Sequence, residues 1–274
     1  MHHQKHDAFS LKKKKLYIFD MDGTIYLGNR VFPFAIRFIK NLRKNDKKVL
    51  FFTNNASHSP AFYLDKLTRL GFEPTADEIM TSGDVTAEFL LRHRPQSSVY
   101  LVGTDDLINN FAERGIRLLS GDEERADIVI TSFDTTLTYK KLDNACRLIR
   151  GGAEYLSTHP DFNCPTETGF IPDSGAIAAF VTASTNKTPT YFGKPYRETL
   201  DMICEATGFE KEEMCIFGDR LYTDIALGRR HGVTSVLVLS GETTLSDVDA
   251  ADEADRPDLI FASLDEVDQA LFGN

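Results

Sequence analysis

Short apolar runs alternate with segments of helical periodicity along most of the chain, and this alternation restricts the fold more than any single motif does. Residues 16–19, LYIF, form a run too short for a helix that ends at Asp20, and residues 34–44 follow with apolar side chains at helical spacing. Residues 49–52, VLFF, and a helix expected at 59–71 repeat this unit. Alternating strands and helices predict an α/β fold with a doubly wound parallel sheet that helices cover on both faces.

The same alternation continues through the middle and the C-terminal third of the chain. Strands are expected at residues 99–102, 128–130, 155–158, 190–192, 214–217, 235–239 and 259–261. Helices are expected at residues 105–114, 139–150, 176–183 and 223–231, and a loop at 169–175. The middle of the chain therefore predicts a second α/β unit, whereas the basic segment 1–15 is expected to be a solvated tail.

Composition limits the kind of partner. The 274 residues include 42% apolar and 26% charged side chains, which is typical of a folded globular protein. A net charge of −10 argues against binding to nucleic acid polymers or to anionic membranes. An anionic substrate would therefore need a local cation at its site, either a metal ion or a buried lysine.

The sequence also bears on location. No apolar run reaches the length of a membrane span, and residues 1–15 lack the apolar core of a signal peptide. The cysteines are Cys146, Cys164, Cys204 and Cys215. Their spacing matches neither a CxxC motif nor a zinc site, so we expect reduced thiols in a cytoplasmic protein.

The strongest local signal is the segment Asp20-Met21-Asp22-Gly23-Thr24, which directly follows a buried strand. Ligands of open parallel sheets bind beyond the carboxyl ends of the strands. At that edge Asp20 could act as a nucleophile or a metal ligand, and Asp22 could exchange protons with a leaving group or a water. A lone Asp-Gly pair would be interpreted as a turn, but this longer pattern after an apolar run favours catalysis.

Polar residues follow three further strands in the same way. Thr53 and Asn54 could contact an oxyanion, although both residue types also end strands and cap helices. Lys194 suits a contact to phosphate, although a lone lysine is usually solvated. Asp219 could complete a magnesium site with Asp20, and Asp224 is interpreted equally well as a ligand or as a residue that complements a helix dipole.

Taken in order, the residues at these four strand ends resemble the four motifs of the haloacid dehalogenase superfamily of phosphohydrolases. The resemblance runs from about Leu16 to Leu271, and the insertion between the second and third motifs resembles the C2-type α/β cap of that superfamily. It implies a Rossmann-like core at residues 16–82 and 185–274 and a cap at 83–184, joined by linkers near Ser82 and Ser184.

Within that superfamily, the chain resembles the NagD-like, p-nitrophenylphosphatase branch. The matching positions are residues 158–161, 165, 169, 172, 175–176 and 193–195. That branch usually reads Thr-Asn-x-Asp and Pro-Gly-x-Gly, where this chain has His159 at the second position of the first pattern and Asp173 at the second position of the other.

Both departures lie in the predicted cap, so they concern the choice of substrate. By the same resemblance, the cap loop would touch the leaving group, and the candidate specificity residues are His159, Asp161, Asn163 and Cys164. A structural histidine and a small apolar filler are the alternative interpretations of His159 and Cys164.

The resemblance implies hydrolysis of a phosphate monoester through an aspartyl-phosphate on Asp20, with Asp22 as acid and base. It implies that Mg²⁺ is held by Asp20, the Asp22 carbonyl and Asp219, with Asp224 outside the direct ligands. Phosphoryl oxygens would contact Thr53, Asn54 and Lys194.

The substrate is then a small phosphorylated metabolite. Candidates are sugar phosphates, nucleoside monophosphates, phosphoglycolate and pyridoxal phosphate. Phosphotransfer to an acceptor other than water, or a binding protein without catalysis, are alternatives, and homodimerisation is left open.

Overall fold

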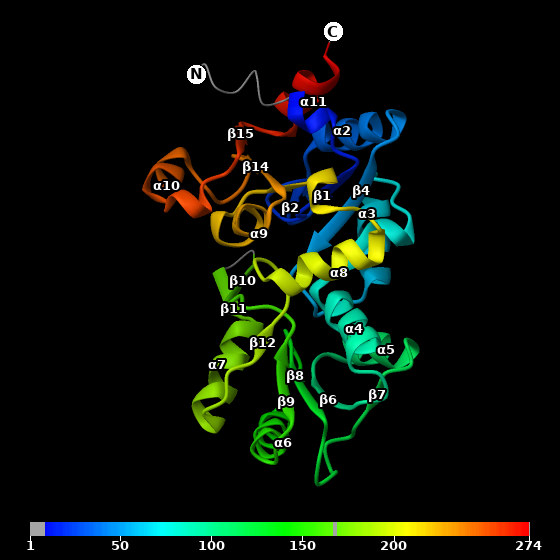
Figure 1. Ribbon diagram of the computed structural model, residues 1–274, viewed down its shortest axis with the longest axis vertical. Coiled ribbons are helices and arrows are strands. Elements are labelled where there is room, and N and C mark those ends of the chain that lie inside the picture. Colours follow the sequence, from blue (N-terminus) through cyan, green and yellow to red (C-terminus); the bar gives the residue numbers. More distant parts are fainter. Residues whose placement is uncertain (1–8, 167–168, 274) are drawn as a thin grey trace. The chain divides into compact units, whose positions relative to one another are not determined.

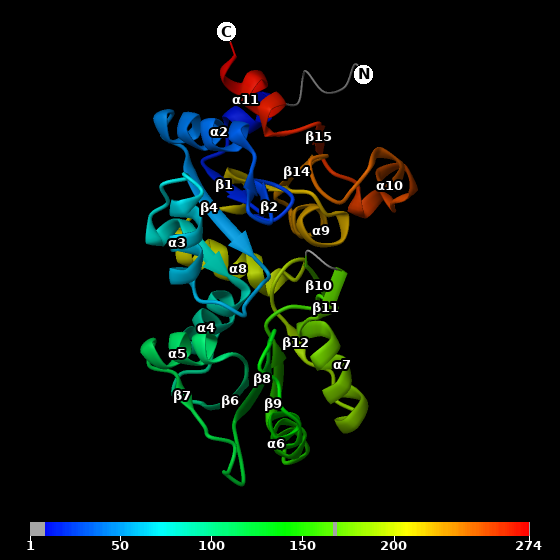
Figure 2. The same ribbon diagram turned by 180° about the vertical axis from the view of Figure 1, so that it is seen from behind.

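The structure, a computed structural model, describes residues 9–166 and 169–273, and the chain divides into two compact units (Figures 1 and 2). The first unit runs up to Phe52 and includes Leu64–Met80 and the chain from Ile203 onward. The second unit comprises Thr53–Tyr63 and Thr81–Met202, and the predicted cap at 83–184 lies inside it. The chain thus passes between the units at four points.

A six-stranded sheet forms the centre of the first unit, in the order β15-β14-β13-β1-β4-β5. The strands are β1 (Leu16–Phe19), β4 (Lys48–Thr53), β5 (Ile79–Thr81), β13 (Met214–Gly218), β14 (Thr234–Val238) and β15 (Leu259–Phe261). The register pairs Phe19 of β1 with Phe217 of β13 and with Phe51 of β4, and these pairings are parallel. Every residue of β1 and β13 is buried, so both faces of the central strands are covered, as the apolar runs predict.

Helices of the first unit present apolar faces to this sheet. The helices in or entering the unit are α2 (Pro33–Lys44), α3 (Pro60–Arg69), α8 (Arg197–Thr207), α9 (Ala226–His231), α10 (Leu245–Ala250) and α11 (Leu264–Phe272). Helix α2 begins with a proline and buries Phe38, whose ring meets Phe19 edge-on at 5.9 Å between ring centres. Figures 1 and 2 show α11 beside α2, where Asp268 accepts hydrogen bonds from Arg37 and Asn41, both at 2.8 Å.

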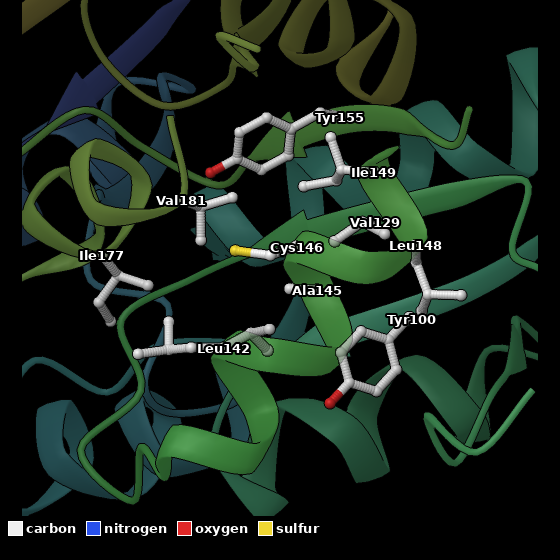
Figure 3. Close-up of a cluster of buried hydrophobic side chains, with 11 residues drawn as sticks. Tyr100, Val129, Leu142, Ala145, Cys146, Leu148, Ile149, Tyr155, Ile177 and Val181 are labelled. Carbon is white, nitrogen blue, oxygen red and sulfur yellow. The ribbon is translucent and has the colours of Figure 1, made fainter. Parts of the chain in front are cut away.

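The second unit contains a five-stranded parallel sheet in the order β12-β9-β8-β6-β7. Its strands are β6 (Ser98–Val102), β7 (Arg117–Leu118), β8 (Ile128–Thr131), β9 (Glu154–Ser157) and β12 (Thr190–Tyr191). Its helices are α4 (Ser82–His93), α5 (Asp105–Glu113), α6 (Tyr139–Arg150) and α7 (Ser174–Thr185). Figure 3 shows its apolar cluster, in which the sulfur of Cys146 of α6 points toward Val181 of α7. The α/β fold with parallel sheets is confirmed.

Strand β12 is expected from the sequence, but it joins the second sheet. Thr190 and Tyr191 pair in parallel with Leu156 and Ser157 of β9, at the edge of the five-stranded sheet. The loop that carries Lys194 therefore follows a strand of the second unit. Sequence periodicity does not reveal which of two parallel sheets a two-residue strand will extend.

A hairpin stands where a loop is expected. β10 (Asn163–Thr166) pairs antiparallel with β11 (Gly169–Pro172), so the prediction of a loop across 169–175 is wrong. Phe170 of this hairpin is 75% exposed. The two strands are short and lack one buried face, so no apolar alternation marks them in the sequence.

The ends of the predicted segments also differ in detail. Residues 9–12 of the predicted tail are helical and Leu11 is fully buried, its carbonyl accepting a 2.6 Å hydrogen bond from the Tyr17 hydroxyl; residues 1–8 lie outside the described residues. Ser82 is the first residue of α4 and Ser184 lies within α7, so the linkers expected there are helical.

Two shorter strands, β2 (Tyr26–Leu27) and β3 (Arg30–Val31), form a small hairpin after the Asp20–Thr24 segment. The four cysteines are free thiols, as expected. Among the described residues no helix combines the length and the apolarity needed to cross a bilayer.

Candidate active site

Three carboxylates of the first unit meet beyond the carboxyl ends of two neighbouring strands. Asp20 follows β1, Asp219 follows β13, and Asp224 lies in the π-helical turn Leu221–Ile225 that comes next. The Asp20 N–H donates to the carbonyl of Phe217 at 2.9 Å, which fixes the two strand ends side by side. One carboxylate oxygen from each aspartate lies within 4.8 Å of the others, and Asp219 and Asp224 are buried.

Asp219 is tightly enclosed. Its Oδ2 accepts a hydrogen bond from the Glu242 N–H at 2.7 Å, whereas its buried Oδ1 has no hydrogen-bond partner among the described residues. A Cβ atom on Gly241 would lie 2.0 Å from Oδ2, and one on Gly23 would lie 2.3 Å from it. Burial raises the pKa of Asp219, and the charges of Asp20 and Asp224 raise it further.

This group of acids fits a hard divalent cation. Oxygen ligands from carboxylates are those that Mg²⁺ and Ca²⁺ prefer, and a cation would offset the repulsion among the three charges. The unsatisfied Oδ1 of Asp219 is the kind of buried acceptor that a cation would satisfy. The glycines around it leave no space for another side chain.

Asp22 has a different environment from these three acids. It is half-buried, its backbone bridges to Tyr26, and its carboxylate is not part of the group of three. Burial raises the pKa of Asp22, the charge of Lys66 lowers it, and Asp20 raises it. A raised pKa suits a carboxyl group that donates a proton, which would leave the role of nucleophile to Asp20.

Lys66 is the residue that sequence reasoning missed here. It lies on α3, with Nζ 4.1 Å from the centre of the Tyr26 ring. Burial lowers the pKa of Lys66, whereas Asp22 raises it. No pattern distinguishes this lysine from others on helix surfaces, because its role depends on a hairpin that folds back from Asp22.

The residues predicted to contact phosphate gather in the second unit. Lys194 is only 2% exposed, and Asn54 brackets its backbone. The Lys194 N–H donates to Asn54 Oδ1 at 2.7 Å, and Asn54 Nδ2 donates to the Lys194 carbonyl at 3.0 Å. Thr53 ends β4 and its Oγ1 accepts from the Asn55 N–H at 3.2 Å. The amide of Asn54 is therefore committed to holding the lysine loop.

The predicted specificity residues fall into two groups. His159 is fully buried and Asp161 accepts from Asn54 Nδ2 at 3.1 Å, so both adjoin the lysine loop. Asn163 and Cys164 lie on β10, exposed and half-buried respectively. Ligand atoms of His159, Asp161 and Asp173 also lie within 4.8 Å of one another. The structure thus brings the acids together in one unit and the phosphate-binding candidates together in the other.

Two sequence families match the chain. Residues 17–117 match the family described as haloacid dehalogenase-like hydrolase, and residues 191–267 match one described as HAD-hydrolase-like. The chain is 33% identical over 261 residues to an acid sugar phosphatase of Staphylococcus saprophyticus, covering 95% of this chain and 99% of that relative.

The chain is also similar to solved structures of phosphatases. A 4-nitrophenylphosphatase from Thermotoga maritima superposes with a TM-score of 0.90 at 41% identity, covering 96% of this chain and 99% of that one. A glycerol phosphate phosphatase from Mycobacterium tuberculosis, solved with magnesium, gives a TM-score of 0.86 at 30% identity, covering 94% of this chain and 77% of that one.

Proposed function

Because the chain belongs to the haloacid dehalogenase-like hydrolases, we propose that this phosphatase hydrolyses small phosphate monoesters with the help of a divalent cation, Mg²⁺ in the first place. The observation that carries the proposal is the cluster of Asp20, Asp219 and Asp224, with Asp22 beside it in a different environment. A reaction between a carboxylate and a phosphate brings two anions together, so the site needs a cation that offsets their repulsion. A cluster of three carboxylates could bind that cation.

In the first half-reaction a carboxylate oxygen of Asp20 forms a bond to phosphorus, and the bond from phosphorus to the ester oxygen breaks. Asp22 donates its proton to the leaving oxygen. The raised pKa of Asp22 supports this role, because the group must be protonated when the substrate arrives.

In the second half-reaction Asp22, now ionised, takes a proton from a water whose oxygen bonds to the phosphorus of the aspartyl-phosphate. The bond to Asp20 breaks, and inorganic phosphate leaves. Asp20, the Asp22 carbonyl and Asp219 would hold the cation, with Asp224 outside the direct ligands. When bound, the cation neutralises negative charge on phosphate and carboxylate.

Thr53 and Lys194 would contact the phosphoryl oxygens, where charge spreads in the transition state. The names of the relatives direct the choice of substrate: one is an acid sugar phosphatase and another is a glycerol phosphate phosphatase. We therefore place sugar phosphates and polyol phosphates first among the substrates. The free cysteines support a cytoplasmic location.

The test is a phosphate-release assay on purified protein with p-nitrophenyl phosphate, sugar phosphates, glycerol phosphate and a nucleoside monophosphate. We expect EDTA to abolish turnover and Mg²⁺ to restore it. Asp20→Asn, which preserves shape, should leave less than about a thousandth of the activity. Full activity in metal-free protein, or turnover by the Asp20→Asn variant, would contradict the mechanism.

A further inference from the structure

His159, which follows β9, is buried with both of its ring nitrogens in polar contact. Nε2 lies 2.8 Å from Oδ1 of Asp173. Nδ1 lies 3.0 Å from Oγ1 of Thr158 and 3.3 Å from Oγ of Ser82. His159, Thr158 and Ser82 are all completely buried, so these protein groups determine where the ring carries its protons.

The two hydroxyls near Nδ1 direct their protons elsewhere. Ser82 Oγ donates to the backbone carbonyl of Asn54 at 2.5 Å, and a carbonyl can only accept. Thr158 Oγ1 donates to Ser132 Oγ at 3.1 Å. Because both neighbouring hydroxyls have used their single proton, Nδ1 must be the donor in its own contacts.

Nε2 must also be a donor, because the oxygen that it meets acts as an acceptor: Oδ1 of Asp173 also accepts a hydrogen bond from the Ser174 N–H at 2.6 Å. With both nitrogens protonated, the ring is an imidazolium. The charged groups that face it are Asp173 and Asp161. Burial by itself lowers the pKa of His159, but these two carboxylates outweigh burial, and the net shift is upward.

The charged ring adjoins the lysine loop. A Cβ atom on Gly193, which has a φ of +75°, would lie 2.6 Å from the His159 Cβ, so the glycine backbone packs directly on the histidine. Ser82 links the ring to the Asn54 carbonyl, and the Asn54 side chain holds the N–H and the carbonyl of Lys194. Any movement of His159 would therefore reach Lys194 through two routes, the glycine and the asparagine.

We propose that His159, as an imidazolium paired with Asp173, is a positioning residue that sets the placement of Lys194 and thereby the affinity for the phosphoryl group. The second part rests on the proposed function, in which Lys194 contacts phosphate. The pair consists of the two positions at which the chain departs from the pattern typical of its branch, and each supplies the partner that the other requires. A buried cation without its anion, or the reverse, would be strongly destabilising.

The first experiment observes the pair directly. Side-chain ¹⁵N–¹H spectra of the full-length protein, with His159 assigned by comparison with His159→Gln, should show both nitrogens protonated at pH 7.5. In Asp173→Asn the signature should change to that of a neutral ring, because asparagine keeps the shape but removes the charge. This readout does not depend on catalysis.

The second experiment measures phosphate affinity. We expect Asp173→Asn to raise both the KM for p-nitrophenyl phosphate and the inhibition constant of inorganic phosphate by about tenfold, with kcat changed less than about threefold. The matched control is Asp134→Asn, since Asp134 is also a buried acid with a cationic partner, Lys141 at 2.7 Å, in the same unit. The control should change these constants less than about twofold.

Ser82→Ala provides a second variant if Asp173→Asn does not fold. It removes the hydroxyl that joins the ring to Asn54 and should also weaken phosphate binding, with the imidazolium signature retained. A neutral His159 in the wild-type protein would overturn the proposal, as would an imidazolium whose loss leaves phosphate affinity unchanged. A change of the His159 signals on adding EDTA would overturn it in favour of a metal held by His159, Asp161 and Asp173.

The proposed function and the positioning role of His159 can fail separately. If the wild-type protein hydrolyses no ester, the proposed function fails. The spectra still show whether His159 and Asp173 form a charged pair, and equilibrium binding of inorganic phosphate still shows whether that pair affects Lys194. If the wild-type protein is active but the variants bind phosphate normally, only the positioning role fails.

Discussion

At the scale of single residues, the site depends on charges that the protein buries in close contact with each other. Asp20, Asp22, Asp219 and Asp224 could be selected from the sequence because each lies at or shortly after the end of an apolar run, where a parallel sheet collects its functional groups. Lys66 could not be selected in this way. It approaches Asp22 only through tertiary folding, and its sequence neighbourhood is that of an ordinary helix.

Replacing Asp219 by asparagine should separate cation binding from folding. The substitution removes one of three mutually repelling charges, so metal-free protein should be no less stable, whereas the stabilisation by added Mg²⁺ should largely disappear. Activity should fall by about a hundredfold or more. Thermal unfolding with and without Mg²⁺, together with the phosphate-release assay, provides the measurement.

The exposed Asp249 offers a control, since Asp249→Asn also removes one acidic group. It should leave the Mg²⁺-dependent shift in unfolding temperature intact. An undiminished shift in Asp219→Asn would mean that the cation binds elsewhere.

Lys66→Met should alter the pH dependence of turnover. The positive charge of Lys66 lowers the pKa of Asp22, so its removal should raise that pKa further. Asp22 acts as an acid only while protonated, and the rate therefore falls as pH rises through its pKa. The alkaline limb of the profile for a poor leaving group, such as a sugar phosphate, should move to higher pH.

The comparison variant is Lys44→Met, because Lys44 is an exposed lysine at the end of α2. Its profile should match that of the wild type. An alkaline limb that stays in place or moves to lower pH in Lys66→Met would rule out the coupling between Lys66 and Asp22.

At the scale of elements, the sequence predicts long or fully buried segments well and short exposed ones poorly. Strands β1, β4, β6 and β13 are apolar runs with both faces covered, so their composition alone identifies them. The β10–β11 hairpin has no such signature, because its hydrogen bonds are local and its side chains are largely exposed.

The residues predicted to determine substrate choice include two on the β10–β11 hairpin. Asn163→Ala and Cys164→Ala on β10 should change the ranking among phosphate monoesters, while p-nitrophenyl phosphate hydrolysis stays within about tenfold of the wild type. The physical reason is that groups binding only the phosphoryl group cannot tell one ester from another. The measurement is kcat/KM on four chemically distinct esters.

Lys194→Ala serves as the contrasting variant, since it should depress every substrate together. A uniform loss from the hairpin variants, with the ranking preserved, would show that this hairpin does not contact the leaving group.

At the scale of the whole molecule, the division into units differs from a simple insertion. In addition to the predicted cap at 83–184, the second unit includes residues 53–63, 81–82 and 185–202. Thr104 Oγ1, for example, donates to the Ser57 carbonyl at 2.8 Å, and the Ser59 N–H donates to Asp106 at 2.8 Å. Such contacts join segments far apart in sequence, so local patterns could not have placed the boundary.

A fragment of residues 83–184 is therefore expected not to unfold cooperatively. It lacks the edge strand β12 and every contact made by residues 53–63. A fragment of residues 53–202, which retains both, should show a cooperative transition in urea followed by circular dichroism. Equal cooperativity of the two fragments would show that the outlying segments add nothing to the fold.

The way in which Asn54 brackets Lys194 has a consequence for recombination between related genes. A chimera joined at residues 83 and 184 would take Asn54 and Lys194 from one parent and His159, Asp161 and Asp173 from the other. The lysine loop would then pack on a residue 159 from the other parent, which is a histidine or an asparagine depending on that parent. The second unit should be exchanged between homologues most successfully with crossovers before Thr53 and after Met202, so that the residues that hold Lys194 are all inherited from one parent.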